Sequence, residues 1–321
     1  MNGIINILKP AGMTSHDVVS AVRRILNEKK AGHTGTLDPM AVGVLPVCLG
    51  GATRIIEYLD EDYKKYRCEL QLGLITDTED IWGTVLSETP VVIEPDGGVE
   101  DGVDKAGVVH VCEAALLEAA GKLVGEMMQT PPSYSAVRVG GRRLYEYARS
   151  GETVAAAPRK INIRRLSIIK IDHQRGRAVF DVESSKGSYI RTLCTAIGEA
   201  LGCGAAMSFL VRTAAGRFEL SDAVTFEELE EAVAENSLEK FLKPADYPLS
   251  RFHRYEISNR GKASYLINGG PLDPEDLDRN ATEETGLFIL ECGGEFIAMA
   301  HFDKEKGRII SDKVFCRELQ N

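Results

Sequence analysis

A change of pattern near Pro248 is the feature that most constrains how this chain can fold. Up to this proline, helical and strand-like periodicities alternate over a long stretch. After it, short apolar runs such as 287–290 and 296–300 are separated by pairs of glycines. Such runs are typical of the strands in a small sheet or barrel. We therefore expect a large part with mixed helices and strands, followed by a β-rich domain of about 70 residues.

Periodicity and capping residues predict several elements of the larger part. The expected elements are a helix capped by Thr14 or Ser15, a short helix at 52–59, a strand at 66–72, a helix at 112–124, a strand at 177–183, a helix at 189–201 and an acidic helix capped by Thr225 and Glu228. The stretch 93–109 is rich in Gly, Asp and Val, and we expect it to be a loose acidic insertion.

Composition indicates a soluble protein of the cytoplasm. No stretch reaches the roughly 18 uninterrupted apolar residues that a membrane span needs. Residues 1–9 lack the basic and then apolar pattern of a signal peptide. The seven cysteines are odd in number and widely scattered, which indicates neither a disulfide framework nor a zinc knuckle. We expect them to be reduced and mostly buried.

Charge is distributed unevenly along the chain. The formal net charge is −10, which by itself argues against a polyanionic partner. Residues 77–118 contain eleven acidic side chains and one lysine, whereas residues 131–170 contain nine Arg and Lys and two Glu. Blocks of one sign are most often solvated faces, but this segregation also suits a basic RNA-facing surface on an acidic body.

The loop 32–39 is the best candidate platform for chemistry. Pro39 biases Asp38 towards an extended conformation, so the carboxylate lies on an irregular segment rather than within a helix. The simpler alternative is that Thr34, Thr36 and Asp38 only form side-chain-to-backbone turns. Local chemistry alone favours that alternative for an arbitrary aspartate.

Arg191 weakens this simpler interpretation. It falls in the first turn of the helix expected at 189–201, where the helix dipole disfavours a cation by roughly 0.3–1 kcal/mol. An anionic partner would offset that cost. If the partner is Asp38, a bidentate pair would keep the carboxylate ionised and oriented. An ordinary surface arginine or a phosphate contact remains the alternative.

Other catalytic templates fit poorly. The chain has no P-loop, no dinucleotide-binding glycine motif after a strand, and no Gly-x-Ser-x-Gly motif. The six histidines are dispersed without the spacing of metal ligands. We therefore expect neither a metal site nor a cofactor.

The loop belongs to a longer stretch that resembles a known motif. Residues 31–50 read AGHTGTLDPMAVGVLPVCLG, and they are similar to the catalytic motif of the TruB family, the tRNA pseudouridine synthases of bacteria. Further segments match motifs of this family in the same order: 9–15, 65–67, 132–136, 144–149, 185–192 and 201–205. Together they cover most of residues 1–216, and residues 266–270 match only loosely.

The resemblance implies a fold of the mixed α/β (α+β) class. It implies a pseudouridine-synthase fold, in which helices flank a central mixed, largely antiparallel sheet. The catalytic domain would span 1–248, with an RNA-gripping insertion around 127–165. A small PUA-like RNA-binding β domain would follow at 249–321.

The resemblance also implies the reaction, which is isomerisation of uridine 55 in the TΨC loop of tRNA to pseudouridine. Asp38 would be the essential carboxylate, and either attack on the sugar or removal of the 2′ proton remains open. Arg191 would pair with Asp38, and Tyr66 would stack on the flipped base. Tyr189 and Leu210 would line the pocket.

The family further suggests which residues touch the RNA. His33 matches a residue thought to assist extrusion of the base by packing against the RNA. The candidate RNA contacts are Lys9, Arg142, Arg143, Lys186 and Arg212. Two positions depart from the family pattern. The family usually has Asn or Asp where this chain has Leu8, and a second arginine where it has Val211, so we expect this chain to lack some of the family's polar contacts to the RNA.

Three functional hypotheses follow. The first is a stand-alone, monomeric, cytoplasmic tRNA-modifying enzyme without cofactor, membrane or protein partner. The second is a guide-RNA-dependent synthase of the dyskerin type, which predicts a basic extension that this chain lacks. The third is an RNA-binding or RNA-folding protein with an idle centre, which predicts loss of Asp38, Tyr66 or Arg191. All three residues are present, so the first hypothesis is favoured.

Overall fold

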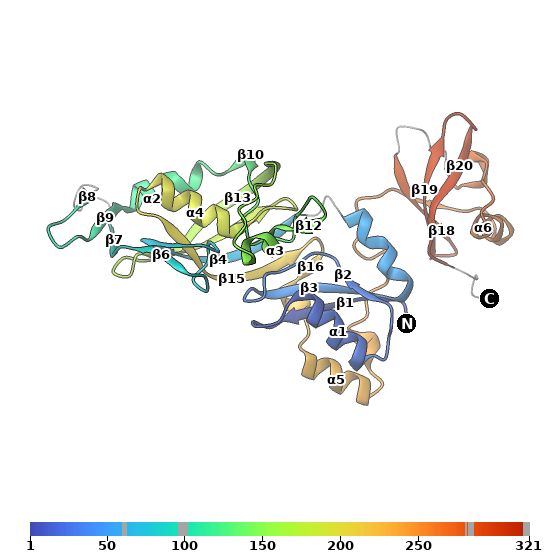
Figure 1. Cartoon of the computed structure of the whole chain (residues 1–321). Helices are drawn as coiled ribbons and strands as arrows, with labels where there is room; N and C mark the ends of the chain where they lie inside the picture. Colours follow the sequence, from blue (N-terminus) through green and yellow to red (C-terminus); the bar gives the residue numbers. More distant parts are fainter. Residues whose placement is uncertain (60–62, 96–101, 280, 282–285, 317–321) are drawn as a thin grey trace.

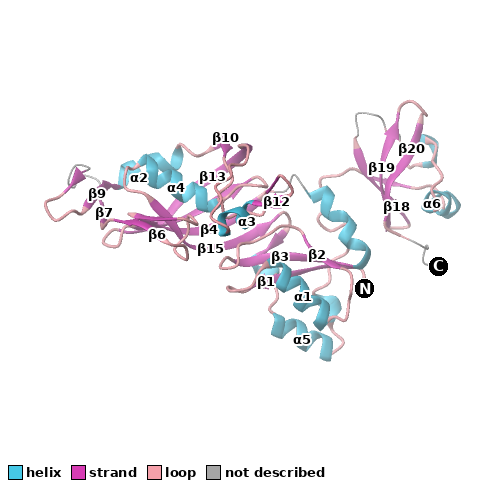
Figure 2. Cartoon of the chain, in the orientation of Figure 1, coloured by secondary structure: helices cyan, strands magenta, loops and turns pink. Residues whose placement is uncertain are grey.

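A large mixed sheet forms the body of the molecule, and a smaller sheet stands at one end of it (Figure 1). The computed structural model describes residues 1–59, 63–95, 102–279, 281 and 286–316. Figure 2 shows that helices lie on the faces of the large sheet, while the last part of the chain is mainly strands. The mixed α/β class is therefore confirmed.

The large sheet contains nine strands in the order β1-β3-β15-β4-β14-β13-β10, with β2 paired to β3 and β16 paired to β15. Of these pairs only β3 with β15 is parallel, so the expected mixed, largely antiparallel sheet is confirmed. The strands are β1 (Gly3–Lys9), β2 (Ala31–His33), β3 (Val42–Leu49), β4 (Lys64–Leu72), β10 (Gly125–Gln129), β13 (Arg159–Asp172), β14 (Arg177–Ser184), β15 (Ala205–Ala215) and β16 (Phe218–Glu219).

The strand β4 shows why one face of this sheet is covered. Its residues Tyr66, Cys68, Leu70 and Leu72 are buried, whereas the intervening side chains are more exposed. This alternation places the apolar residues on one face of the pleated strand. Helices α2 (Glu113–Gly121) and α4 (Ile190–Ala200) contribute apolar residues to the core on that face.

A second layer covers the sheet around β1 and β3. Helices α1 (Ser15–Ile25) and α5 (Phe226–Ala234) pack there against apolar residues of both strands. Thr14 caps α1, and Thr225 caps α5 in a capping box with Glu228, as expected. At the edge of β3, Gly43 has a φ of +107°, and an added Cβ would lie 2.3 Å from the carbonyl oxygen of Arg212. Only glycine fits this close approach of β3 to β15.

The last part of the chain forms the smaller sheet, in the order β17-β18-β19-β20. Its elements are β17 (Arg254–Glu256), α6 (Arg260–Ile267), η4 (Pro274–Asp276), β18 (Leu287–Cys292), β19 (Glu295–Asp303) and β20 (Arg308–Val314). The strands expected at 287–290 and 296–300 are thus confirmed. A 3₁₀ helix, η1 (Gly50–Leu59), packs between the two sheets in a shared apolar core.

The acidic insertion differs from its prediction. Its described residues form a three-stranded sheet rather than a loose loop, because Val91, Ile93 and Val111 are buried. Residues 96–101 lie outside the described residues. The smaller elements of the chain are β5 (Leu74–Thr76), β6 (Val85–Glu88), β7 (Val91–Glu94), β8 (Gly102–Val103), β9 (Val109–Cys112), β11 (Arg138–Val139), β12 (Arg142–Arg143), α3 (Leu144–Arg149), η2 (Leu220–Asp222) and η3 (Leu238–Lys240).

Two global expectations concern membranes and disulfides. Within the described ranges, no helix combines the length and the apolar character needed to cross a membrane. All seven cysteines are free thiols, five of them buried. Cys68 and Cys194 are the sulfur pair that approaches most closely among the recorded contacts, at 3.5 Å between β4 and α4.

Candidate active site

Asp38 and Arg191 form the ion pair that the helix-dipole argument predicts. Arg191 Nε donates to Asp38 Oδ2 at 2.8 Å, and Arg191 Nη2 donates to Asp38 Oδ1 at 3.3 Å. The Arg191 side chain is 4% exposed, whereas that of Asp38 is 37% exposed. The guanidinium therefore forms the floor of the site, and the carboxylate stays accessible to a ligand.

The remaining donors of Arg191 bind two other segments. Its Nη1 donates to the carbonyl of Thr78 at 2.8 Å, and its Nη2 also donates to the carbonyl of Tyr134 at 3.0 Å. These acceptors and Asp38 offset the cost of a buried cation in the first turn of α4. One side chain thus joins the loop of Asp38, the segment after β5 and the insertion around 127–165.

The loop of Asp38 is held by its own turn and by a buried serine. The carbonyl of Asp38 accepts a hydrogen bond from the N–H of Ala41 at 3.1 Å, in a turn whose second residue is proline. Ser15 Oγ accepts from the N–H of Leu37 at 2.8 Å and donates to the Leu37 carbonyl at 3.2 Å. Because Thr14 caps α1, Ser15 is left to bind the loop, a role that the sequence did not reveal.

Two expected RNA contacts have a different place in the structure. Lys9 and Arg212 are both fully buried, which leaves neither side chain exposed to an RNA. Lys9 Nζ donates to the carbonyls of Pro39 and Ala41 at 2.8 and 2.7 Å. Arg212 donates to the carbonyls of Gly35 and Val44, among others. Both side chains are buried because the loop turns its backbone carbonyls inward, and these two cations donate hydrogen bonds to them.

Burial also changes the acidity of Lys9. It lowers the pKa of the Lys9 ammonium from its ordinary value of 10.5 to about 8, and attraction to Asp38 partly opposes this shift. The charge of Lys9 is therefore sensitive to pH just above neutrality.

Tyr66 and Leu210 belong to the apolar core that also contains Leu37 and Ala41 on either side of Asp38. They lie on the neighbouring strands β4 and β15 and are only 8% and 5% exposed. Burial raises the pKa of the Tyr66 hydroxyl, and the guanidinium of Arg212 opposes this rise. The phenol of Tyr66 therefore stays neutral at neutral pH.

Tyr189 is positioned by Gln129, a residue that the sequence interpretation missed. Gln129 is 4% exposed, and it lies at the end of β10. Its Nε2 donates to the carbonyl of Tyr189 at 3.0 Å, and its Oε1 accepts from the N–H of Tyr189 at 2.8 Å. The side chain therefore pairs with the residue that caps α4, two residues before Arg191.

His33 is half-buried at the end of β2. Burial lowers the pKa of its imidazole, and the nearby positive charges of Arg212, His16 and Lys64 lower it further. The neutral ring is therefore favoured at neutral pH. Its buried Nδ1 has no hydrogen-bond partner among the described residues.

Acidic residues next to the site were also missed. Burial raises the pKa of the Asp80 carboxyl, while Thr78 and the charge of Arg191 oppose the shift. Burial likewise raises the pKa of Glu79, whose Oε2 accepts from Thr192 Oγ1 at 2.7 Å. In the sequence these carboxyls are part of an acidic block, and nothing distinguished them from a solvated face.

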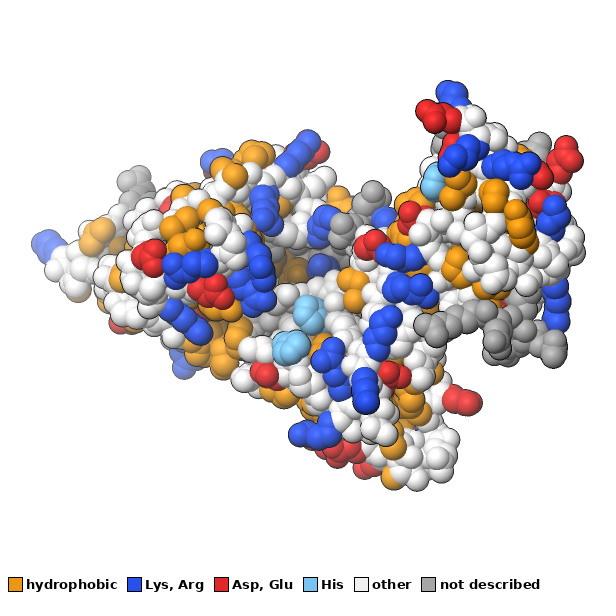
Figure 3. Space-filling model, turned by 45° about the vertical axis from the view of Figure 1, so that its right-hand side comes forward, with side chains coloured by type: hydrophobic (Ala, Val, Ile, Leu, Met, Phe, Trp, Pro, Cys, Tyr) orange, Lys and Arg blue, Asp and Glu red, His pale blue; other side chains and the backbone are white. Residues whose placement is uncertain are grey.

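The other three expected RNA contacts are exposed. Arg142 and Arg143 lie in β12 and Lys186 lies in the turn after β14. Arg142 stacks at 4.2 Å over the ring of Tyr147. Figure 3 shows many Lys and Arg side chains bordering the hollow in the middle of one face. Within the described ranges, no cluster of His, Cys, Asp and Glu could hold a metal ion.

Two family models match adjoining parts of the chain. Residues 23–190 match the model described as "TruB family pseudouridylate synthase (N terminal domain)". Residues 191–250 match the model described as "tRNA pseudouridylate synthase B C-terminal domain". The first match alone covers more than half of the chain.

Similar proteins agree with these matches. A protein from Alkaliphilus oremlandii named tRNA pseudouridine synthase B is 48% identical over 84% of this chain and 82% of its own length. One of the same name from Clostridioides difficile is 41% identical over 98% of this chain and 100% of its own length. The crystal structure titled as a Cbf5-Nop10-Gar1 complex contains a chain that is 26% identical with a TM-score of 0.71, covering 98% of this chain and 85% of that one.

Proposed function

This chain belongs to the TruB family of pseudouridylate synthases, and on that premise we propose how its residues isomerise uridine 55 in the TΨC loop of tRNA. It is a pseudouridine synthase that acts on tRNA. The observation that carries the proposal is the pair of Asp38 with Arg191, in which an accessible carboxylate is oriented by a buried guanidinium.

The reaction breaks the bond between C1′ and N1 of the uridine and forms a bond between C1′ and C5. The C5 proton is lost and N1 gains a proton, so atoms and electrons balance without an oxidant or cofactor. Asp38 starts the reaction, either by attacking C1′ or by removing the 2′ proton. Both routes need an ionised, oriented carboxylate, which the Arg191 pair supports.

The other site residues bind the flipped base. The base leaves its stack before it can react, and an apolar, aromatic pocket replaces the lost stacking. Tyr66 provides an aromatic face, and Tyr189 and Leu210 complete the pocket. The neutral ring of His33 packs against the RNA where the base leaves it. Arg142, Arg143 and Lys186 contact the RNA backbone from the exposed surface.

The chain is proposed to act alone in the cytoplasm, as a monomer and without a metal. We assign residues 1–248 to a catalytic domain, with the RNA-gripping insertion around 127–165. Residues 249–321 form a PUA-like RNA-binding domain in this proposal. The separate four-stranded sheet with its own core supports this division.

The test is site-by-site mapping of pseudouridine in an unmodified tRNA transcript treated with the purified chain alone. We expect product at uridine 55 only. Asp38→Asn should lower turnover by roughly three powers of ten or more, with RNA binding largely kept. Product at another position, or turnover that needs a guide RNA or protein partner, would contradict the proposal. Full activity of Asp38→Asn would exclude Asp38 as the reactive group.

A further inference from the structure

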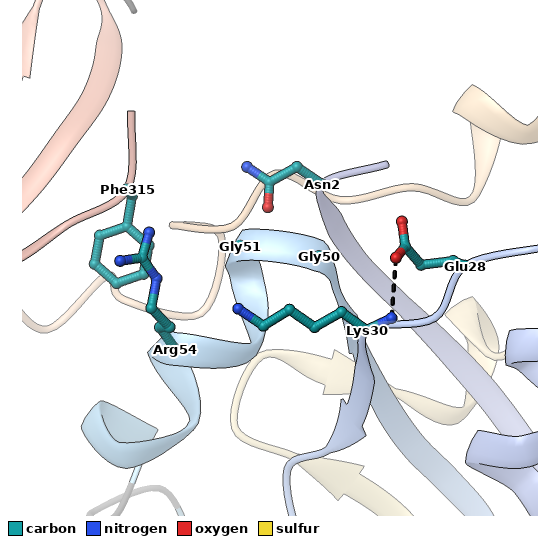
Figure 4. A pocket seen from close by; sticks show the side chains of 7 residues that line it. All are labelled: Asn2, Glu28, Lys30, Gly50, Gly51, Arg54 and Phe315. Atoms are coloured by element: carbon teal, nitrogen blue, oxygen red, sulfur yellow. Dashed lines mark hydrogen bonds between the residues drawn. The ribbon is translucent and has the colours of Figure 1, made fainter. Parts of the chain in front are cut away.

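A cavity of about 500 Å³ lies where η1 meets the start and the end of the chain. Figure 4 shows the residues around it, which come from η1 and from the segments next to β1, β2 and β20. They are Asn2, Glu28, Lys30, Gly50, Gly51, Arg54 and Phe315. This cavity is separate from the pocket of Asp38, because none of its lining residues belongs to that site.

The cavity is rich in hydrogen-bond donors. Figure 4 shows the side chain of Lys30 extending across it towards Arg54. The guanidinium of Arg54 lies over the ring of Phe315 at 5.3 Å, and its buried Nε has no acceptor within the described part of the chain. A buried donor without an acceptor is costly, and the other N–H groups of the same guanidinium are donors suited to an anion.

The acceptors in this cavity are already engaged. Glu28 Oε2 accepts from the amino group of Met1 at 3.0 Å, and Glu28 Oε1 accepts from the N–H of Lys30 at 3.0 Å. Asn2 Oδ1 accepts from the N–H of Ala52 at 2.7 Å. The groups that remain available to a ligand are therefore the Lys30 ammonium, the Arg54 guanidinium and the Asn2 amide nitrogen. This set suits a phosphate group.

The position of the cavity indicates where such a phosphate comes from. Lys30 directly precedes β2, and His33 ends the same strand. Lys30 and His33 are three residue steps apart along extended chain, which corresponds to about 10 Å. On the other side, Phe315 directly follows β20 of the smaller sheet. The cavity thus lies between β2, which leads into the reactive loop, and the end of β20 in the smaller sheet.

We propose that this cavity binds a backbone phosphate of the RNA substrate, with Lys30 and Arg54 as its charged ligands. The inference rests on the proposed function and adds an RNA contact built by η1 and by segments that adjoin both sheets. Because the contact is distant from the reacting atoms, it contributes equally to ground-state and transition-state binding. Its loss therefore raises KM and leaves kcat unchanged.

The experiment measures tRNA affinity at several salt concentrations for Lys30→Glu, Arg54→Gln and the matched control Lys29→Glu. Lys29 is a neighbouring exposed lysine outside the cavity lining. We expect each cavity variant to weaken binding by roughly fivefold or more and to reduce the slope of log Kd against log salt by about one. The control should change both quantities much less.

Turnover separates this inference from the proposed function. At saturating tRNA, Lys30→Glu should keep the wild-type kcat, whereas loss of kcat in Asp38→Asn depends only on the reactive site. Lys30 is exposed, so its replacement tests the cavity even if Arg54→Gln disturbs the packing on Phe315. Equal effects of Lys29→Glu and Lys30→Glu would overturn the inference. An unchanged tRNA affinity combined with saturable binding of inorganic phosphate would do so as well, because the source would then be a free anion.

Discussion

Three buried side chains hold the backbone on both sides of Asp38. Ser15 binds Leu37, Lys9 binds the carbonyls of Pro39 and Ala41, and Arg212 binds earlier carbonyls of the loop. All of these bonds go to the backbone, so they orient the carboxylate without competing for it. A loop held in this way loses little entropy when its aspartate meets a substrate.

The lowered pKa of Lys9 predicts opposite effects of pH on activity and on stability. Above about pH 8 the ammonium loses its proton, and the neutral amine has only two N–H donors for three carbonyls. Turnover at saturating tRNA should therefore fall as pH rises through about 8. In the unfolded chain the pKa of Lys9 is about 10.5, so the unfolded chain binds more protons than the folded one between about pH 8 and 10.5. The contribution of Lys9 to the free energy of unfolding therefore increases with pH over this interval.

Single-turnover rates and denaturant unfolding between pH 7 and 9.5 check this prediction. A rate that stays flat to pH 9.5 would mean that the Lys9 charge is not needed to hold the loop.

The sequence predicted the partners of the central ion pair but not the supports around it. Arg191 could be singled out because a cation at a helix N-terminus is unfavourable without an anion. Lys9 and Arg212 were expected to contact the RNA because of the family resemblance alone, and nothing local in the sequence indicated that they are buried. Which backbone carbonyls turn inward depends on the packing of β3 against β15, and no local pattern in the sequence records that.

Among the helices and strands, the start of α4 carries several of the hydrogen bonds that hold the site together. Gln129 binds the residue that caps the helix, and Arg191 in its first turn binds Asp38, Thr78 and Tyr134. Hydrogen bonds therefore connect β10, through the first turn of α4, to the guanidinium of Arg191. The insertion and the reactive loop are thus coupled through this one helix end.

Replacing Gln129 by Leu should affect both stability and catalysis. The change leaves the N–H of Tyr189 without its partner, while the carbonyl keeps only the N–H of Leu193, and an unsatisfied group of this kind costs about 1–3 kcal/mol. We expect the free energy of unfolding to fall by roughly 1–3 kcal/mol, and kcat to fall more than KM rises. Denaturant titration and steady-state kinetics measure these effects.

Met128→Leu is the matched control, since Met128 is the adjacent residue of β10 and is 61% exposed. If Gln129→Leu lowers stability but keeps the wild-type kcat, then Gln129 only supports the fold and does not position α4.

Elements with a clear local period were predictable, whereas those that depend on distant pairing were not. The helix α1 and the strand β4 follow from their apolar spacing and, for α1, from its cap. The long strand β13 was hidden in a basic segment, because its outward residues are arginines and lysines. Its strand character becomes evident only through its pairing with β10 and β14.

Across the whole molecule, η1 connects the two sheets. Ile55 and Tyr58 of this helix share a core with Ile289 and Met299 of the smaller sheet. The ring of Phe315 stacks on Phe296 at 4.6 Å, and Tyr58 donates a hydrogen bond to Asp312. Since η1 directly follows β3, the smaller sheet is attached to the strand that continues from the reactive loop.

Removing the ring of Phe315 should uncouple the two parts. Phe315→Ala deletes a side chain that is 7% exposed, at a cost of about 3 kcal/mol or more for the lost packing. We expect calorimetry to show two separate transitions where the wild-type protein shows one. Leu287→Ala is a suitable comparison because Leu287 is 36% exposed and outside this core. A single, merely lowered transition would show that the sheets unfold together without Phe315.

The distance in sequence between Asp38 and Arg191 also affects when a newly synthesised chain becomes active. The two residues are 153 positions apart, so at usual rates of translation roughly 10 to 30 s pass between their appearance on the ribosome. Arg212, which binds the same loop, is made later still. A nascent chain therefore displays its aspartate long before it can orient it. Newly made molecules become competent only when these long-range contacts form, so the onset of activity reports a late step of folding.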